Sequence, residues 1–103
     1  MSAVKGELIM CVVNEGFSED VMDAARAAGA TGGTVLSAHG SVNKDAEEFF
    51  NINIQPLKNV VLIAVRPEIK DAVLKALYEK CGFDTPSRGI AFSLPLDGIV
   101  GLK

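Results

Sequence analysis

Two unbroken apolar runs, residues 8–13 and 60–65, constrain the fold of this chain more than any other feature. Short continuous runs rich in β-branched residues are typical of strands that are buried on both faces. Each run is far shorter than the ~20 residues of a membrane-spanning helix. The runs therefore predict two central strands of one sheet, with a cover on each face of that sheet.

Each apolar run is followed by the signals of a helix. After the first run, Ser18 is expected to cap a helix that carries two acids in its first turn, and Gly29 is expected to end it. After the second run, Pro67 suits the first helical position, where its missing N–H costs nothing, and Gly82 is expected to close the helix.

Further strands are predicted at residues 34–39 and 90–94, so a strand–helix–strand unit occurs twice. This repeat is typical of the ferredoxin-like fold. We predict a single α+β domain over residues 1–103, with β-α-β-β-α-β order and a four-stranded antiparallel sheet. Both helices of that fold cover the same face, so a second copy of the sheet is the simplest cover for the other face. Self-association is expected, although the strand pattern does not set the number of copies.

Charge and composition exclude several classes of partner. The net charge is −3 and lysines and arginines form no cluster, so neither nucleic acid nor an anionic membrane finds a basic face. Residues 1–6 lack the apolar core of a signal peptide, and a cytoplasmic protein is expected. One histidine and two distant cysteines make no metal-ligand spacing, so no metal site is predicted. Cys11 and Cys81 are interpreted as reduced and structural, while a disulfide between them stays open.

Two connections are longer or richer in functional residue types than the scaffold needs. Residues 41–57 begin polar and then alternate apolar with polar residues, which fits either a hairpin extension packed on a neighbouring subunit or an arm that a ligand orders. We favour the arm. Residues 83–89 form either a simple turn or a cradle in which backbone N–H groups and Arg88 hold a phosphate or carboxylate.

No catalytic constellation can be assembled from the chain. A Ser/His/Asp or Cys/His set has no local support, so the protein is expected to bind rather than to catalyse. The glycine-rich residues 29–34 match neither a dinucleotide fingerprint nor a P-loop, and alone they indicate a helix-to-strand turn. His39, which ends a predicted strand, is alone more typical of a structural residue than of a catalyst.

Three segments resemble the nitrogen regulatory P-II (PII) superfamily of signal-transduction proteins. They are residues 29–35, 56–63 and 88–96, with Gly40 opening the long loop and residues 99–102 following the last strand. Their order and spacing agree over nearly the whole chain. The resemblance implies a cytoplasmic homotrimer of ferredoxin-like subunits, an allosteric sensor that binds a small-molecule effector in the clefts between subunits. The effector would be an adenine nucleotide (ATP, ADP or AMP), and no cofactor is required.

Carried over by position, the resemblance implies a ligand cleft lined by residues from four segments: Gly32, Gly33 and Thr34; His39, Gly40 and Ser41; Ser87, Arg88, Gly89 and Ile90; and Lys103 from the neighbouring subunit. It also implies that the 41–57 loop contacts a regulated partner, for which a membrane transporter is one candidate. The side chains assigned to that contact are Phe49, Phe50 and Ile52.

The chain departs from typical members in ways that alter the expected ligand. The loop lacks the tyrosine that is uridylylated in other members, since the only tyrosine is Tyr78. Leu62 replaces an acid near the adenine, Ile90 a phosphate-binding lysine, and Gly101 an arginine. Each lost bond to a charged group costs about 1.5–3 kcal/mol. We therefore expect a nucleotide mono- or diphosphate, another adenine-containing molecule or a small anion.

Other functions on the same fold remain as alternatives. The first is a metal-handling trimer of the copper-tolerance type, against which the scattered Cys, His and Met residues argue. The second is acylphosphatase-like catalysis, for which Arg88 has no placed asparagine partner. The third is RNA binding on the sheet, which would need exposed aromatic residues to stack the bases.

Overall fold

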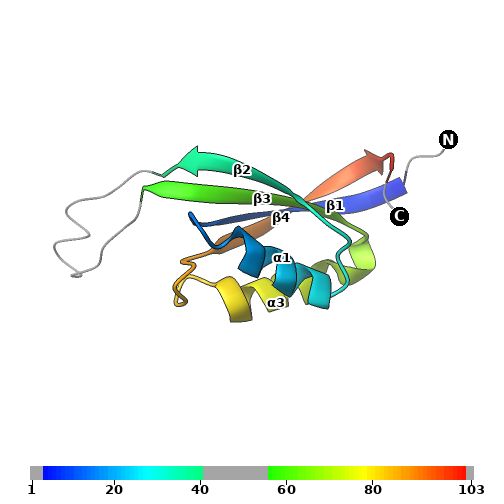
Figure 1. Ribbon diagram of the computed structural model, residues 1–103. Helices are drawn as coiled ribbons and strands as arrows, with labels where there is room; N and C mark the ends of the chain where they lie inside the picture. The colour runs from blue at the N-terminus through cyan, green and yellow to red at the C-terminus, as the bar shows by residue number, and fades with distance from the viewer. Residues whose placement is uncertain (1–3, 41–55, 102–103) are drawn as a thin grey trace.

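The computed structural model describes residues 4–40 and 56–101, which form a four-stranded antiparallel sheet and two helices (Figure 1). The sheet order is β2-β3-β1-β4, so the two apolar runs are its central strands. This arrangement confirms the predicted ferredoxin-like class. In chain order the elements are β1 (Val4–Asn14), α1 (Ser18–Ala27), β2 (Thr34–His39), β3 (Leu57–Val65), the 3-10 turn η1 (Pro67–Ile69), α3 (Lys70–Cys81) and β4 (Ile90–Ile99).

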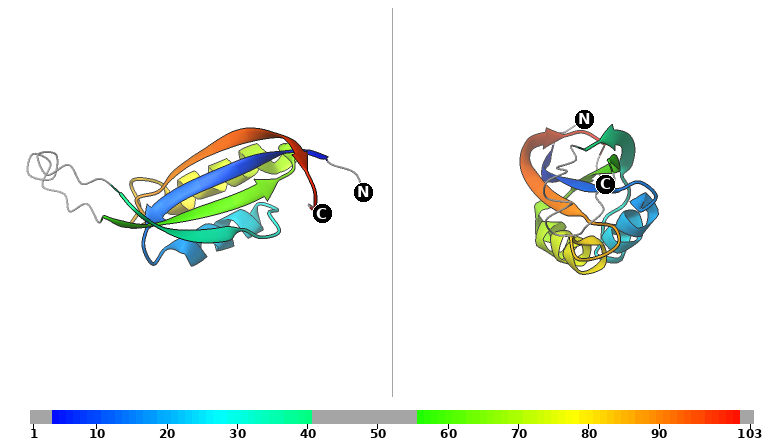
Figure 2. Two further views of the ribbon diagram at one scale, coloured as in Figure 1. Left: turned by 90° about the horizontal axis from the view of Figure 1, so that it is seen from above. Right: turned by 90° about the vertical axis from the view of Figure 1, so that its left-hand side faces the viewer.

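The hydrophobic core lies between the sheet and the two helices, which cover the same face (Figures 1 and 2). Alternate residues of β1 and β3 point toward the helices and are fully buried, among them Ile9 and Ile63. Val21 of α1 and Leu77 of α3 close on them from the other side. Only one half of each apolar run is explained by this core.

The other half of each run lies on the uncovered face of the sheet. The register places Met10 of β1 between Leu62 of β3 and Phe92 of β4, all on this face. Phe92 and Leu94 are 43% and 47% exposed, respectively. We call this surface the open face. It consists of Leu8, Met10, Val12, Leu36, Val60, Leu62, Ala64, Ile90, Phe92 and Leu94. A continuous apolar surface of this kind is typical of a protein–protein interface.

The helix ends agree with the sequence at three of four positions. Gly29 has φ +112°, and the amides of Gly29 and Ala30 donate to the carbonyls of Arg26 and Ala25 at 3.0 Å each, a Schellman motif. Pro67 begins η1, which leads directly into α3, and Gly82 ends α3. The prediction for Ser18 was wrong. The carbonyl of Phe17 accepts the first helical bond, so Ser18 lies inside the first turn and its hydroxyl caps nothing.

Both cysteines are buried and free, as the sequence analysis favoured. Burial raises the pKa of the Cys11 thiol from 9.0 to about 12, with a smaller contribution from Cys81. Burial and then the Asp20 charge raise the pKa of Cys81, while a hydrogen bond from Ser87 lowers it. Both thiols therefore stay protonated and unreactive in the folded protein at neutral pH.

Native protein is expected to show no reaction with a thiol reagent at pH 8, and two thiols after denaturation. Because the folded-state pKa of Cys11 is raised, its neutral form stabilises the fold fully below pH 9. That contribution is lost as the pH rises from 9 toward 12. Urea unfolding at several pH values, compared with Cys11→Ala, measures it. Rapid labelling of the native protein would contradict the buried, protonated state.

Candidate functional site

The predicted ligand residues lie in two groups on opposite edges of the sheet. Gly32, Gly33 and Thr34 lead into β2, which is one edge strand, and residues 87–90 lead into β4, which is the other. Three interstrand spacings separate β2 from β4, roughly 14 Å. A single copy of the chain therefore does not bring the two groups into one cleft.

The first group lines a shallow cavity of about 400 Å³ beside β2 and β3, which we call the Thr34 hollow. Its floor includes Leu62 and Ala64, which belong to the open face, and its rim is the main chain before β2. An apolar floor with backbone amides and carbonyls at its edge suits a flat heteroaromatic ring. The lining residues are Leu8, Thr31, Gly32, Gly33, Thr34, Leu62 and Ala64.

The two neighbouring glycines of the hollow differ in how closely they approach β3. A Cβ on Gly33 would lie 2.9 Å from the Leu62 carbonyl oxygen and 3.0 Å from the Met22 sulfur, whereas a Cβ on Gly32 would meet nothing within 4 Å. Gly33→Ala is expected to lower the free energy of unfolding by about 1–3 kcal/mol through overpacking. Gly32→Ala is expected to change it by less than about 0.5 kcal/mol. Urea denaturation measures both, and equal effects would contradict the close packing.

The second group forms a tight loop, residues 82–89, which we call the Ser87 loop. The amide of Gly89 donates to the Cys81 carbonyl at 2.8 Å, and the amide of Asn14 donates to the Ser87 carbonyl at 2.9 Å. Ser87 is 2% exposed and its hydroxyl bonds to the Cys81 thiol, so its side chain is turned away from solvent. Only the main chain of Ser87 is left for a ligand.

Arg88 is the exposed cation of the Ser87 loop. Its backbone has φ +49°, a left-handed conformation that is uncommon for a residue with a side chain. The guanidinium lies 5.5 Å from the centre of the Phe83 ring and donates to the Phe83 carbonyl at 2.9 Å. These contacts hold the planar group at the loop surface with further N–H donors for an anion.

The base of the long loop lies at the same end of the sheet as the Ser87 loop (Figure 1). His39 pairs with Leu57, and the Gly40 amide donates to the Pro56 carbonyl at 2.6 Å. Beside them, Lys58 Nζ donates to Asn14 Oδ1 at 2.6 Å. Sequence reasoning missed this pair, although Lys58 is the only charged residue in β3.

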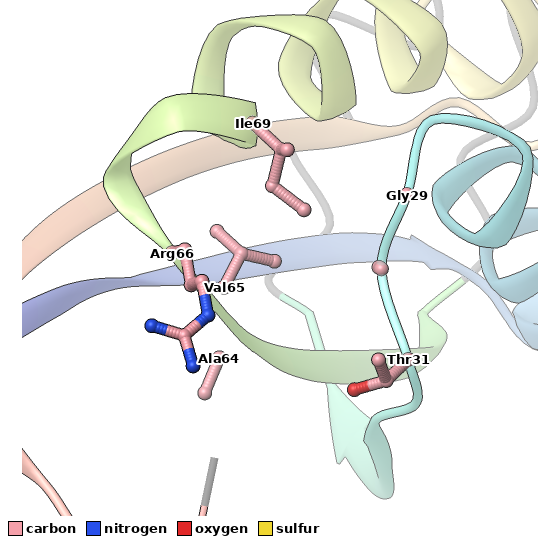
Figure 3. Close-up of a pocket in the computed structure, with 7 residues that line it drawn as sticks. Gly29, Thr31, Ala64, Val65, Arg66 and Ile69 are labelled. Carbon is pink, nitrogen blue, oxygen red and sulfur yellow. The ribbon is translucent and has the colours of Figure 1, made fainter. Parts of the chain in front are cut away.

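A smaller cavity of about 120 Å³ adjoins the Thr34 hollow and shares Thr31 and Ala64 with it (Figure 3). Arg66 from the end of β3 and Thr31 from the opposite segment flank it, and Ile69 of η1 extends toward it. Arg66 is a second cation that sequence reasoning did not count. The cavity is large enough for a small anion but not for a nucleotide.

Five predicted residues, which are Ser41, Phe49, Phe50, Ile52 and Lys103, lie outside the described residues. Within residues 4–40 and 56–101, no three His, Cys, Asp or Glu side chains are grouped so as to hold a metal ion. In the same part of the chain, neither helix is long and apolar enough to span a membrane.

No protein-family model matches the sequence, and no curated protein matches it either. Solved structures do match the fold over most of its length. CPII from Thiomonas intermedia K12, a nitrogen regulatory PII-like protein bound to ADP, AMP and bicarbonate, aligns with a TM-score of 0.69 and 15% identity, covering 95% of this chain and 96% of its own. A protein from Thermus thermophilus, assigned as PII-like in signalling, gives 0.70, 18%, 93% and 90% for the same quantities.

The GlnK–ATP complex from B. subtilis aligns with a TM-score of 0.67 and 17% identity, covering 89% of this chain and 82% of GlnK. At these identities the alignments establish the arrangement of helices and strands. The chain therefore has the fold of the PII-like signalling proteins.

Proposed function

We propose that the chain is a divergent member of the PII superfamily, a homotrimeric sensor that binds an adenine nucleotide or a small anion between subunits. One observation carries this proposal: the predicted ligand residues occupy opposite edges of a sheet whose uncovered face is apolar. Copies that bury this face against one another bring the β2 edge of one subunit toward the β4 edge of the next. The Thr34 hollow of one copy and the Ser87 loop of another then form a single cleft.

The ligand is inferred from the chemistry of the two groups. The Thr34 hollow offers an apolar floor for a base, and the Ser87 loop offers Arg88 for a phosphate or carboxylate. ADP, AMP and bicarbonate accompany CPII, and ATP accompanies GlnK, which supports the same ligand classes here. Ile90 is 57% exposed and brings no charge to the cleft, so a mono- or diphosphate should bind better than a triphosphate.

The signal is proposed to leave through the 41–57 segment, in which Phe49, Phe50 and Ile52 contact a regulated protein such as a membrane transporter. Binding at the cleft would bias that segment toward one conformation, which is how ligands switch segments in signalling proteins. No catalytic step is needed in this scheme, and the protein acts in the cytoplasm. Nitrogen status is one signal that such a sensor could report.

Sedimentation and a thermal-shift screen test the proposal together. Purified protein should sediment as a trimer, and ADP or AMP at a hundred times its Kd should stabilise it by about 2.7 kcal/mol. The panel also holds ATP, bicarbonate, 2-oxoglutarate and cyclic dinucleotides. A monomer that no compound stabilises would overturn the proposal. Stoichiometric copper binding that is lost in His39→Ala would favour the metal-handling alternative instead.

A further inference from the structure

Asn14 is the last residue of β1 and connects two segments that lie on either side of it. Its amide donates to the Ser87 carbonyl at 2.9 Å, and its side-chain Nδ2 donates to the Pro86 carbonyl at 3.4 Å. Its Oδ1 accepts the 2.6 Å bond from Lys58 Nζ. A side-chain amide can accept from a lysine and donate to a carbonyl at once. Neither aspartate nor an aliphatic residue can do both.

Lys58 carries the connection onward to the base of the long loop. Its side chain is partly buried and passes so close to Gly40 that a Cβ there would lie 3.1 Å from Lys58 Cε. Gly40 in turn donates to the Pro56 carbonyl. Next to this path, the amide of Glu15 donates to the Leu57 carbonyl at 3.1 Å. The Ser87 loop and the Gly40–Pro56 pair are therefore joined by one continuous set of contacts.

We propose that Asn14 and Lys58 are positioning residues that couple the conformation of the Ser87 loop to the Gly40–Pro56 end of the β2–β3 pair. The inference rests on the proposed function insofar as a ligand at Arg88 would use this coupling. The coupling itself is a property of the chain without ligand. It requires the Lys58 ammonium and both polar atoms of the Asn14 side chain, because removing any of them breaks the contact on one side.

A ligand-free experiment tests the coupling directly by amide hydrogen exchange of the intact protein. Lys58→Met touches only the Gly40 side, yet we expect the Arg88 and Gly89 amides to exchange about fivefold faster or more. Lys58→Arg should restore slow exchange, and Lys75→Met, a change at an exposed lysine of α3, should leave it unchanged. The Gly29 and Ala30 amides, at the other end of α1, report general loosening and should stay within twofold. If the Arg88 and Gly89 rates stay within twofold of wild type in Lys58→Met, the coupling is wrong.

Asn14 variants supply a second, graded readout. Asn14→Asp keeps an acceptor for Lys58 but loses the donor to Pro86, so the Gly40 amide should stay slow while the Ser87-loop amides accelerate. Asn14→Leu should accelerate both groups, and the same rates for Asp and Leu at Gly40 would contradict the assigned roles. Adding ADP to wild type and Asn14→Leu separates the two hypotheses. ADP that slows exchange at Arg88 in both proteins, but at Gly40 only in wild type, supports the coupling of a ligand. Absence of any ADP effect would contradict the proposed function and leave the ligand-free result to decide the coupling.

Discussion

Phe92→Glu is expected to convert the trimer into folded monomers. Phe92 lies on the open face opposite Met10 and is 43% exposed in the single chain, so a carboxylate there remains hydrated while the subunit is alone. Burying that carboxylate without a partner costs several kcal/mol per subunit. A loss of even about 3 kcal/mol weakens association by more than a hundredfold. Sedimentation equilibrium measures the change, and far-UV circular dichroism reports whether the monomer keeps its fold.

Tyr78→Glu is the matched control for this substitution. Tyr78 is also an aromatic residue and is 75% exposed, but it lies on α3, which covers the other side of the sheet. The same carboxylate at this position should leave the trimer intact. A trimer that survives Phe92→Glu, or one that Tyr78→Glu disrupts, would show that the open face is not the subunit interface.

Most of the fold could be predicted because its determinants are local. The apolar runs at β1 and β3 and the stop at Gly29 are properties of adjacent residues, and the structure contains all of them. Ser18 failed for an equally local reason. The chain turns one residue earlier, with the Phe17 amide 3.3 Å from the Asn14 carbonyl, so the helix starts before the capping hydroxyl is needed.

The site was less predictable because its parts depend on register and strand order. Lys58 meets Asn14 only because β1 and β3 pair in one particular register across 44 residues of sequence. The separation of Thr34 from Arg88 depends on β2 and β4 being the two edge strands. Residue spacing carries neither fact. What the sequence did indicate correctly was the need for a second copy, since unbroken apolar runs require cover on both faces.

Arg88→Ala is expected to weaken ADP binding by about 10- to 150-fold. The guanidinium is the exposed cation of the Ser87 loop, and a hydrogen bond to a charged group contributes about 1.5–3 kcal/mol. Arg88→Lys should fall between wild type and Arg88→Ala, because an ammonium supplies the charge without the planar fork. Isothermal titration of each protein with ADP measures the affinities.

Arg88→Gly separates the loss of the cation from any damage to the loop. Both Arg88→Ala and Arg88→Gly remove the guanidinium and its contacts with Phe83, but only glycine relaxes the left-handed backbone at φ +49°, which costs an L-residue about 1–2 kcal/mol. The glycine variant should therefore melt at a higher temperature than the alanine variant, while both lose ADP affinity to the same extent. If both variants bind ADP within twofold of wild type, Arg88 does not contact the phosphates. If affinity instead follows the melting temperature, Arg88 acts by shaping the loop and not through its charge.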